Sequence, residues 1–322
     1  MDKEGNIISG FYAGRTHSII NIDSWDLGLK IDGRDVNKEV MDTVKAFMTK
    51  YRIAPYNEVT HKGLVRHVLI RIGVKTKQIM VCVIINGKNL PNKEKLVEEL
   101  CKLEGMYSIS LNINTKKSNV ILGDKVINLY GPGYIEDYIG DVKFRISPLS
   151  FFQVNPVQTE KLYNKALEYA NLGENDTVFD IYCGIGTISL FLAQKAKKVY
   201  GIEIVEDAIK DAKRNAKINN MDNVEFYVGK AEEVVPKMYK EGKRANVVVV
   251  DPPRKGCDEK VLDTIVSMEP DRVVYVSCNP STLARDLAYL NERGYKCHEI
   301  QPVDMFPHSV HVENVAWLSK EK

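Results

Sequence analysis

The sequence predicts an α/β protein of two domains: an α+β domain over residues 1–147, followed over residues 148–322 by a mostly parallel sheet with helices on both faces. From Thr177 onward, short apolar runs alternate with segments of helical spacing. Near-continuous apolar strands separated by helices are typical of parallel sheets that are buried on both faces. A length of 322 residues also suits two ordinary domains.

Alternating apolar segments predict the strands of the first domain. Residues 68–74 and 79–85 flank a short polar connection, which is the pattern of a β-hairpin, and residues 93–103 have helical spacing. Further strands are expected at 108–113, 119–122 and 126–129. Basic residues of this domain are candidates to follow a phosphate backbone, although any exposed sheet carries such charges. They include His61, Lys62, Arg66, His67 and Arg71.

The second domain follows a passage rich in Gly, Pro and aromatic residues between residues 130 and 152, which places the boundary near Pro148. Residues 156–170 have helical spacing and lead into the sheet. Strands are then predicted at 178–182, 198–203, 224–228, 247–250 and 273–277, and helices at 187–196, 207–219, 260–268 and 282–293.

The turn after the first of these strands has the features of a nucleoside site. In the segment DIYCGIGTIS, Gly184 and Gly186 allow the backbone to come close to a ligand at a helix start. The next strand ends at Glu203, nineteen positions beyond Gly184 (203 minus 184), where an acidic side chain can hold the two hydroxyls of a ribose. These features do not separate a nicotinamide dinucleotide from S-adenosylmethionine, although Ser189 replaces the third glycine of GxGxxG.

Cys278 ends the predicted strand 273–277 and immediately precedes a helix start, Asn279-Pro280-Ser281. A thiol at the carboxyl edge of an open α/β sheet lies where ligands bind, and N–H groups of a nearby helix start favour the thiolate. A cysteine at the end of an apolar strand is also commonly a small buried hydrophobe. These residues alone do not decide between a reactive thiol and a buried structural cysteine.

Two carboxylates are predicted near this edge. Asp251 ends the strand 247–250, and the two prolines that follow it fix an extended backbone. Glu313 lies in a strand-like run with Val310, Val312 and Val315. A carboxylate that is desolvated beside a ligand edge is a candidate base, because desolvation raises its pKa toward neutrality.

Composition excludes several classes of protein. Hydrophobic residues make up 44% and charged residues 27% of the chain, and no apolar run approaches the ~20 residues of a membrane span. The start MDKEGNIISG lacks the pattern of a secretory signal, so we expect a cytoplasmic protein with no membrane partner. The six cysteines are scattered without a CxxC pair, and His308 and His311 alone make a poor metal site.

Six ordered motifs resemble those of the RNA uracil-C5 (5-methyluridine) methyltransferases: FFQVNP, DIYCGIGTISL, YGIEIVE, VVVVDPPRKG, VVYVSCNPSTLARDL and DMFPHSVHVENV. The last motif looks more like the 23S rRNA uridine branch than the tRNA T-loop branch. The resemblance implies a Rossmann-like class I S-adenosylmethionine-dependent methyltransferase domain with a mostly parallel seven-stranded sheet, preceded by a central α+β RNA-contacting domain. It implies a monomer that methylates C5 of a uridine in RNA, with 23S rRNA favoured over tRNA.

The resemblance also assigns roles to residues. Cys278 matches the nucleophile that adds to C6 of uracil, and Glu313 matches the general base that removes the C5 proton. Residues that match contacts to S-adenosylmethionine are Gln153, Tyr182, Gly184, Glu203 and Asp251.

The sequence departs from the family pattern at its start. Many members begin with a small RNA-binding β-barrel domain, and many hold an iron–sulfur cluster on four N-terminal cysteines. Neither feature is found in the sequence, so we expect a chain without that barrel, without a metal and without an iron–sulfur cluster.

Three alternative functions remain. Exocyclic-amine methyltransferases also carry Asp-Pro-Pro, but they usually place an aromatic residue where this chain has Arg254, and they need no cysteine. A non-catalytic RNA-binding protein could retain the nucleoside pocket, but it would not need both Cys278 and Glu313. A nicotinamide oxidoreductase is the third.

Overall fold

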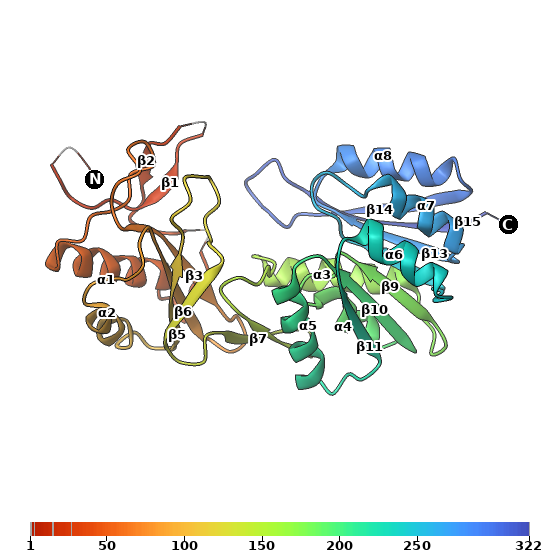
Figure 1. The fold of residues 1–322 in the computed structure, drawn as a ribbon, viewed down its shortest axis with the longest axis horizontal. Coiled ribbons are helices and arrows are strands. Elements are labelled where there is room, and N and C mark those ends of the chain that lie inside the picture. Colours follow the sequence, from red (N-terminus) through yellow and green to blue (C-terminus); the bar gives the residue numbers. More distant parts are fainter. Residues whose placement is uncertain (1, 3, 15, 27, 322) are drawn as a thin grey trace. The chain divides into compact units, whose positions relative to one another are not determined.

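The computed structural model describes residues 2, 4–14, 16–26 and 28–321. The chain forms two compact units (Figure 1): unit 1 comprises Met1–Tyr138 and Ile146–Leu149, and unit 2 comprises Ile139–Arg145 and Ser150–Lys322. The chain passes between them within the two-stranded sheet of β7 (Ile135–Ile139) and β8 (Val142–Ile146).

Unit 1 is built on a four-stranded sheet in the order β3-β4-β5-β6. Strand β4 is buried along its whole length, since it pairs antiparallel with β3 and parallel with β5 while α1 and α2 pack on the sheet. The elements of unit 1 before β7 are β1 (Gly10–Tyr12), β2 (Ile19–Asn21), α1 (Val36–Lys50), β3 (Val65–Ile72), β4 (Ile79–Ile85), α2 (Lys93–Leu100), β5 (Met106–Ile113) and β6 (Lys125–Tyr130). The predicted hairpin of β3 and β4 is confirmed.

The strand predicted at 119–122 is wrong, because this segment has no strand pairing. Its carbonyl groups are bonded by a side chain instead: the Asn114 amide donates to the carbonyls of Val120 (2.7 Å) and Ile121 (2.9 Å). Helix α1 was not predicted, although Asp35 caps it and accepts from the N–H of Lys38.

Unit 2 contains a seven-stranded sheet in the order β11-β10-β9-β12-β13-β15-β14. The first five strands are parallel, and β15 runs antiparallel between β13 and β14. The elements are α3 (Pro156–Ala170), β9 (Thr177–Ile181), α4 (Thr187–Ala193), β10 (Lys198–Glu203), α5 (Glu206–Ile218), β11 (Val224–Val228), α6 (Ala231–Lys240), β12 (Val247–Val250), α7 (Glu259–Met268), β13 (Arg272–Ser277), α8 (Pro280–Asn291), β14 (Tyr295–Val303) and β15 (Glu313–Lys320).

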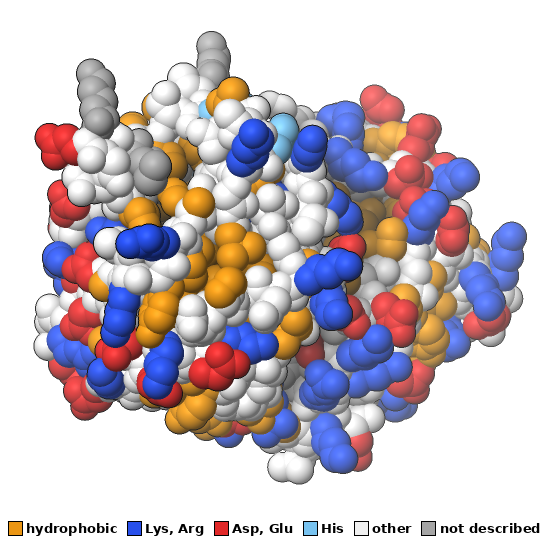
Figure 2. All heavy atoms as spheres, turned by 60° about the vertical axis from the view of Figure 1, so that its left-hand side comes forward, with side chains coloured by type: hydrophobic (Ala, Val, Ile, Leu, Met, Phe, Trp, Pro, Cys, Tyr) orange, Lys and Arg blue, Asp and Glu red, His pale blue; other side chains and the backbone are white. Residues whose placement is uncertain are grey.

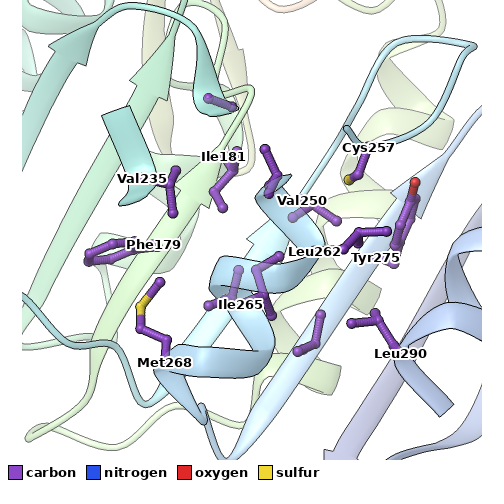
Figure 3. Packing of buried hydrophobic residues seen from close by; sticks show 14 of the residues in the cluster. Phe179, Ile181, Val235, Val250, Cys257, Leu262, Ile265, Met268, Tyr275 and Leu290 are labelled. Carbon is purple, nitrogen blue, oxygen red and sulfur yellow. The ribbon is translucent and has the colours of Figure 1, made fainter. Parts of the chain in front are cut away.

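Helices cover both faces of this sheet. Figure 3 shows Phe179, Ile181 and Val250 from the strands beside Leu262 and Ile265 of α7, in the core that α6, α7 and α8 close. Helices α3, α4 and α5 contact the strands on the other face. The alternation of apolar strands and helices follows from this double burial, and the predicted fold class is confirmed.

One detail of the sheet differs from the prediction. Strand β15 begins at Glu313, so Val310 and Val312 lie in the preceding loop, and the Val310 side chain is 95% exposed. Within the described part of the chain, every helix is too short or too polar to cross a lipid bilayer.

Candidate active site

Parallel strands bring most of the predicted site residues to one edge of the unit 2 sheet. Tyr182 and Gly184 follow β9, Glu203 ends β10, Asp251 follows β12 and Cys278 follows β13. Since these four strands are parallel, the residues at their carboxyl ends lie at the same edge, which is where open α/β sheets bind ligands.

Glu313 reaches this edge from the antiparallel strand β15. The pairing of β13 with β15 ends with Ser277 opposite Asn314, so Cys278 and Glu313 each lie one residue beyond this last pair, at the carboxyl end of β13. On its other side, Glu313 pairs with Val303 of β14. Glu313 is 3% exposed, and the half-buried Cys278 thiol is close enough for the Glu313 carboxyl group to raise its pKa.

Burial sets the protonation of these two groups. It raises the pKa of Glu313 to about 7, against which the charge of Arg254 acts. Burial is also the largest cause of the raised pKa of the Cys278 thiol, and the nearby carboxyl groups of Glu313 and Asp251 raise it further. The charge of Arg254 again opposes this rise. The positive charge of Arg254 therefore favours the ionised forms of Glu313 and Cys278.

The start of α8 does not bring the pKa of the Cys278 thiol below its ordinary value. The first N–H groups there are already bonded: Asn279 N–H donates to Ser277 Oγ at 3.1 Å, and Ser281 N–H donates to the Asn279 side chain at 3.0 Å. Burial of Cys278, followed by the charges of Glu313 and Asp251, instead raises the pKa of the thiol.

Asp251 is half-buried at the same edge, and its N–H donates to the Ile181 carbonyl at 3.2 Å. Burial raises its pKa well above the ordinary range, and the carboxyl groups of Glu313 and Asp180 add to the rise. Asp180 is fully buried on β9, its pKa is raised by burial to about 7, and its Oδ1 atom has no hydrogen-bond partner among the described residues. Crowded, desolvated carboxyl groups of this kind suit a cationic ligand.

The turn after β9 is shaped for close approach of a ligand. Tyr182 has a φ of +73°, a left-handed conformation that costs a non-glycine residue about 1 kcal/mol or more. Gly184 follows with φ +54° and no atom within 4 Å of where its Cβ would lie. Both oxygens of Glu203 are fixed by backbone donors, Gly184 N–H at 3.2 Å and Val205 N–H at 2.9 Å. The turn therefore holds one carboxylate in a set orientation beside open space.

Gln153 precedes α3 and is 8% exposed. Two residues further on, the Asn155 amide donates to the Met305 carbonyl at 3.3 Å, which anchors this segment. The Oδ1 atom of buried Asp180, which has no partner among the described residues, and the fixed carboxylate of Glu203 together fit a polar, positively charged nucleoside.

The structure adds two residues to the predicted site. Arg254 is the exposed side chain whose charge acts on both Glu313 and Cys278, and its place directly after Asp-Pro-Pro was the available signal. Tyr163 of α3 bonds Thr187 Oγ1 at 3.1 Å, and its pKa is raised by burial and by nearby carboxyl groups, with Asp251 foremost. Tyr163 lies within the predicted helix 156–170, and no sequence pattern singled it out.

The basic residues predicted to face a phosphate backbone divide into two groups. The Arg66 prediction is wrong: its side chain is 0% exposed and is bonded to Glu58 at 3.2 Å and to the Asn114 and Lys116 carbonyls. Burial lowers the pKa of both His67 and Arg71. Lys62 is exposed. Figure 2 shows basic and acidic side chains interspersed with hydrophobic ones on the face turned forward.

No group of three or more His, Cys, Asp or Glu side chains among the described residues has the arrangement of a metal site. His308 and His311 lie in the loop before β15.

Comparisons with known proteins agree with the geometry. A sequence profile described as tRNA (uracil-5-)-methyltransferase matches residues 57–321. A curated protein of Bacillus cereus, named as an uncharacterized RNA methyltransferase, is 57% identical over 318 residues, which is 98% of this chain and 68% of that protein. A protein of Clostridium tetani with the same name is 51% identical over 318 residues, with the same coverage of 98% and 68%.

A solved structure is similar over nearly the whole chain. The tRNA (uracil-54, C5)-methyltransferase of Pyrococcus abyssi, in complex with S-adenosyl-L-homocysteine, is 33% identical and superposes with a TM-score of 0.81, covering 95% of this chain and 72% of that one. With a family profile that matches most of its length and relatives at this identity, the chain belongs to the tRNA (uracil-5-)-methyltransferase family, as its motifs predict.

Proposed function

We propose that this chain methylates C5 of a uridine in 23S rRNA through a covalent adduct between Cys278 and C6 of the base. Membership of the family makes the chain an RNA methyltransferase that uses S-adenosylmethionine. The observation that carries the covalent mechanism is that the neighbouring strands β13 and β15 bring a thiol and a carboxyl group to the same ligand edge, where the charge of Glu313 acts on Cys278. A methyltransferase acting on an exocyclic amine needs no such pair.

S-adenosylmethionine supplies the methyl group from its sulfonium. We assign its binding to Gln153, Tyr182, Gly184, Glu203 and Asp251. Glu203 is oriented to accept from the ribose hydroxyls, and Gly184 lets the backbone come close. The raised pKa of Asp251 supports the assignment, because a cationic ligand would relieve the repulsion among neighbouring carboxyl groups.

The residues of the chain carry the remaining chemistry. C5 of uracil is a weak nucleophile, and addition of the Cys278 thiolate at C6 makes C5 enolate-like and able to take the methyl group. Glu313, as carboxylate, then removes the C5 proton. The electrons of that C–H bond reform the C5–C6 double bond and expel Cys278 as thiolate.

We further assign residues 1–147 to RNA contact and residues 148–322 to catalysis, in a monomer of the cytoplasm. The RNA must present an unstacked uridine, since extruding a base costs a few kcal/mol and loops reduce that cost. The DMFPHSVHVE segment favours 23S rRNA. The alternative target is tRNA, which is favoured by the similarity to the Pyrococcus abyssi enzyme.

Two experiments test these proposals. RNA from cells with and without the gene is mapped for 5-methyluridine: loss from 23S rRNA supports the target, and loss from tRNA alone contradicts it. For the mechanism, RNA with 5-fluorouridine at the mapped position is incubated with the protein and S-adenosylmethionine. Fluorine cannot leave as a proton, so a denaturation-resistant protein–RNA complex is expected, and its absence despite normal turnover of uridine RNA would refute the adduct.

A further inference from the structure

The loop of residues 251–257, called here the Asp-Pro-Pro loop, is bonded along its length to the first turns of α8. The Arg254 carbonyl accepts from the Asn279 side-chain amide at 3.0 Å, and the Thr282 hydroxyl donates its one proton between the Arg254 and Asn279 carbonyls, each 3.2 Å away. The next carbonyl, that of Lys255, accepts from Arg285 Nη2 at 2.9 Å. Side chains of the helix that follows the nucleophile thus hold the backbone at Arg254 and at Lys255.

The far end of the loop is fixed by a buried carboxylate. Asp286 is 1% exposed, and its Oδ2 accepts from Cys257 N–H at 2.8 Å and from the Tyr275 hydroxyl at 2.6 Å. Its Oδ1 accepts from Arg285 Nε at 2.8 Å. Figure 3 shows Cys257 and Tyr275 next to each other at this place. The carboxylate therefore ties the loop to both β13 and α8.

The local sequence is fitted to this arrangement. Asn279, Thr282 and Asp286 follow one another at intervals of three and four residues, which places them on one face of α8. Gly256 has φ +80°, and a Cβ there would lie 2.5 Å from Arg285 Nη2 and 2.6 Å from Asp286 Oδ2. Any side chain at position 256 would push the loop off the helix.

The hydrogen bonds between the Asp-Pro-Pro loop and α8 fix the position of Arg254. It is the cation whose charge acts on both Cys278 and Glu313, yet its side chain is exposed. The hydrogen bonds that fix its place therefore come from its backbone, through Asn279 and Thr282.

We propose that Asn279, Thr282, Arg285 and Asp286 are positioning residues that hold the Asp-Pro-Pro loop so that Arg254 faces the Cys278–Glu313 pair. The proposal rests on the proposed function and extends it: the helix that begins after the nucleophile also sets the electrostatics of the base. A purely structural role for these four residues would affect stability without changing how the reaction depends on pH.

The test compares Thr282→Val, which loses the donor, with Thr282→Ser, which keeps it. Thr264→Val is the matched control, because Thr264 Oγ1 bonds the Lys260 carbonyl of α7 at 2.7 Å and touches neither loop nor site. Steady-state release of the methylated RNA product, the step that needs Glu313 as base, is measured against pH, together with KM for the RNA. The groups that face Glu313 and contribute to the profile are Cys278, Asp251, Arg254 and Tyr163.

For Thr282→Val we expect a rate about 3- to 10-fold lower at neutral pH with KM changed less than about twofold, as for loss of one hydrogen bond that acts on positioning. Displacing the Arg254 charge raises the pKa of Glu313, so the rising limb of the profile should move to higher pH. Thr282→Ser and Thr264→Val should match the wild type. In an Arg254→Gln background, Thr282→Val should have no further effect on the limb.

The proposal would be overturned if the rising limb of the pH profile did not move in Thr282→Val. It would also be overturned if Thr282→Val lowered the rate equally in the wild-type and Arg254→Gln backgrounds. If Thr282→Val melts below the control, Arg285→Gln replaces it, since that side chain is 57% exposed, and the same criteria apply. Failure of the proposed function is seen separately, as absence of 5-methyluridine with the wild type and with Thr264→Val.

Discussion

Replacing Glu313 with glutamine tests the base directly, because glutamine has the same shape and cannot accept the C5 proton. Addition of Cys278 and methylation at C5 do not require this carboxylate, whereas release of the product does. Glu313→Gln should therefore accumulate a methylated protein–RNA adduct and lower the turnover rate by about 10²- to 10⁴-fold, the usual contribution of a general base.

The burial of Glu313 also predicts how much the free energy of unfolding changes with pH. Its pKa rises from the usual 4.5 to about 7 on folding, which corresponds to about 3 kcal/mol for a side chain that is 3% exposed. The folded state holds this proton more tightly than the unfolded chain does. The contribution to stability is thus fully present below the unfolded pKa and is lost as pH rises through about 7.

Glutamine has no proton to lose, so the fall in the free energy of unfolding between about pH 4.5 and 8 should shrink by about 3 kcal/mol in Glu313→Gln. Urea unfolding at a series of pH values measures this, and Glu174→Gln, at an exposed glutamate, is the control. The adduct is measured as a gel shift that survives denaturation. Fast product release by Glu313→Gln would remove Glu313 from the base role, and an unchanged pH dependence of stability would refute its titration near neutrality.

Three further predictions concern single contacts. Cys278→Ala should abolish methyl transfer and adduct formation while calorimetry still detects S-adenosylmethionine binding; residual turnover in this variant would contradict the nucleophile. Gly184→Ala places a side chain at φ +54°, with a strain of about 1 kcal/mol, and should weaken S-adenosylmethionine binding about 5-fold or more; unchanged affinity would mean that the turn does not contact the ligand. Tyr275→Phe removes a 2.6 Å hydrogen bond to buried Asp286 and should lower the free energy of unfolding by about 1–3 kcal/mol in urea, and a neutral effect would show that water replaces the hydroxyl.

The sequence predicts best where one physical signal dominates. Helix α3 has the predicted bounds 156–170, and strands β11 and β12 have the predicted bounds 224–228 and 247–250, because a helical apolar spacing in α3 and β-favouring residues in the two strands leave little choice. The strand predicted at 119–122 fails for a non-local reason, since the side chain of Asn114 takes the carbonyls that a neighbouring strand would have bonded.

The site was predictable in its members but not in its electrostatics. Motif spacing singles out Cys278, Asp251 and Glu313 one by one, while the pairing of β13 with β15 that brings Cys278 and Glu313 to one edge exists only in the folded sheet. The rise in the thiol pKa depends on burial and on carboxyl groups that are distant in sequence, which no local pattern contains. Arg66 fails for the same reason, because its exposure is decided by the chain that folds over it.

The place of β15 between β13 and β14 has a consequence for how the enzyme can fail. Cys278 directly follows β13, which belongs to the parallel part of the sheet. Glu313 is instead on β15, which follows α8 and β14 in the chain and pairs antiparallel with both β13 and β14. Local opening of the β14–β15 hairpin would leave the nucleophile in place and carry the base away. In this state the enzyme could still form the covalent adduct with RNA but could not release it. The stability of the β14–β15 hairpin therefore protects the RNA from being trapped on the enzyme.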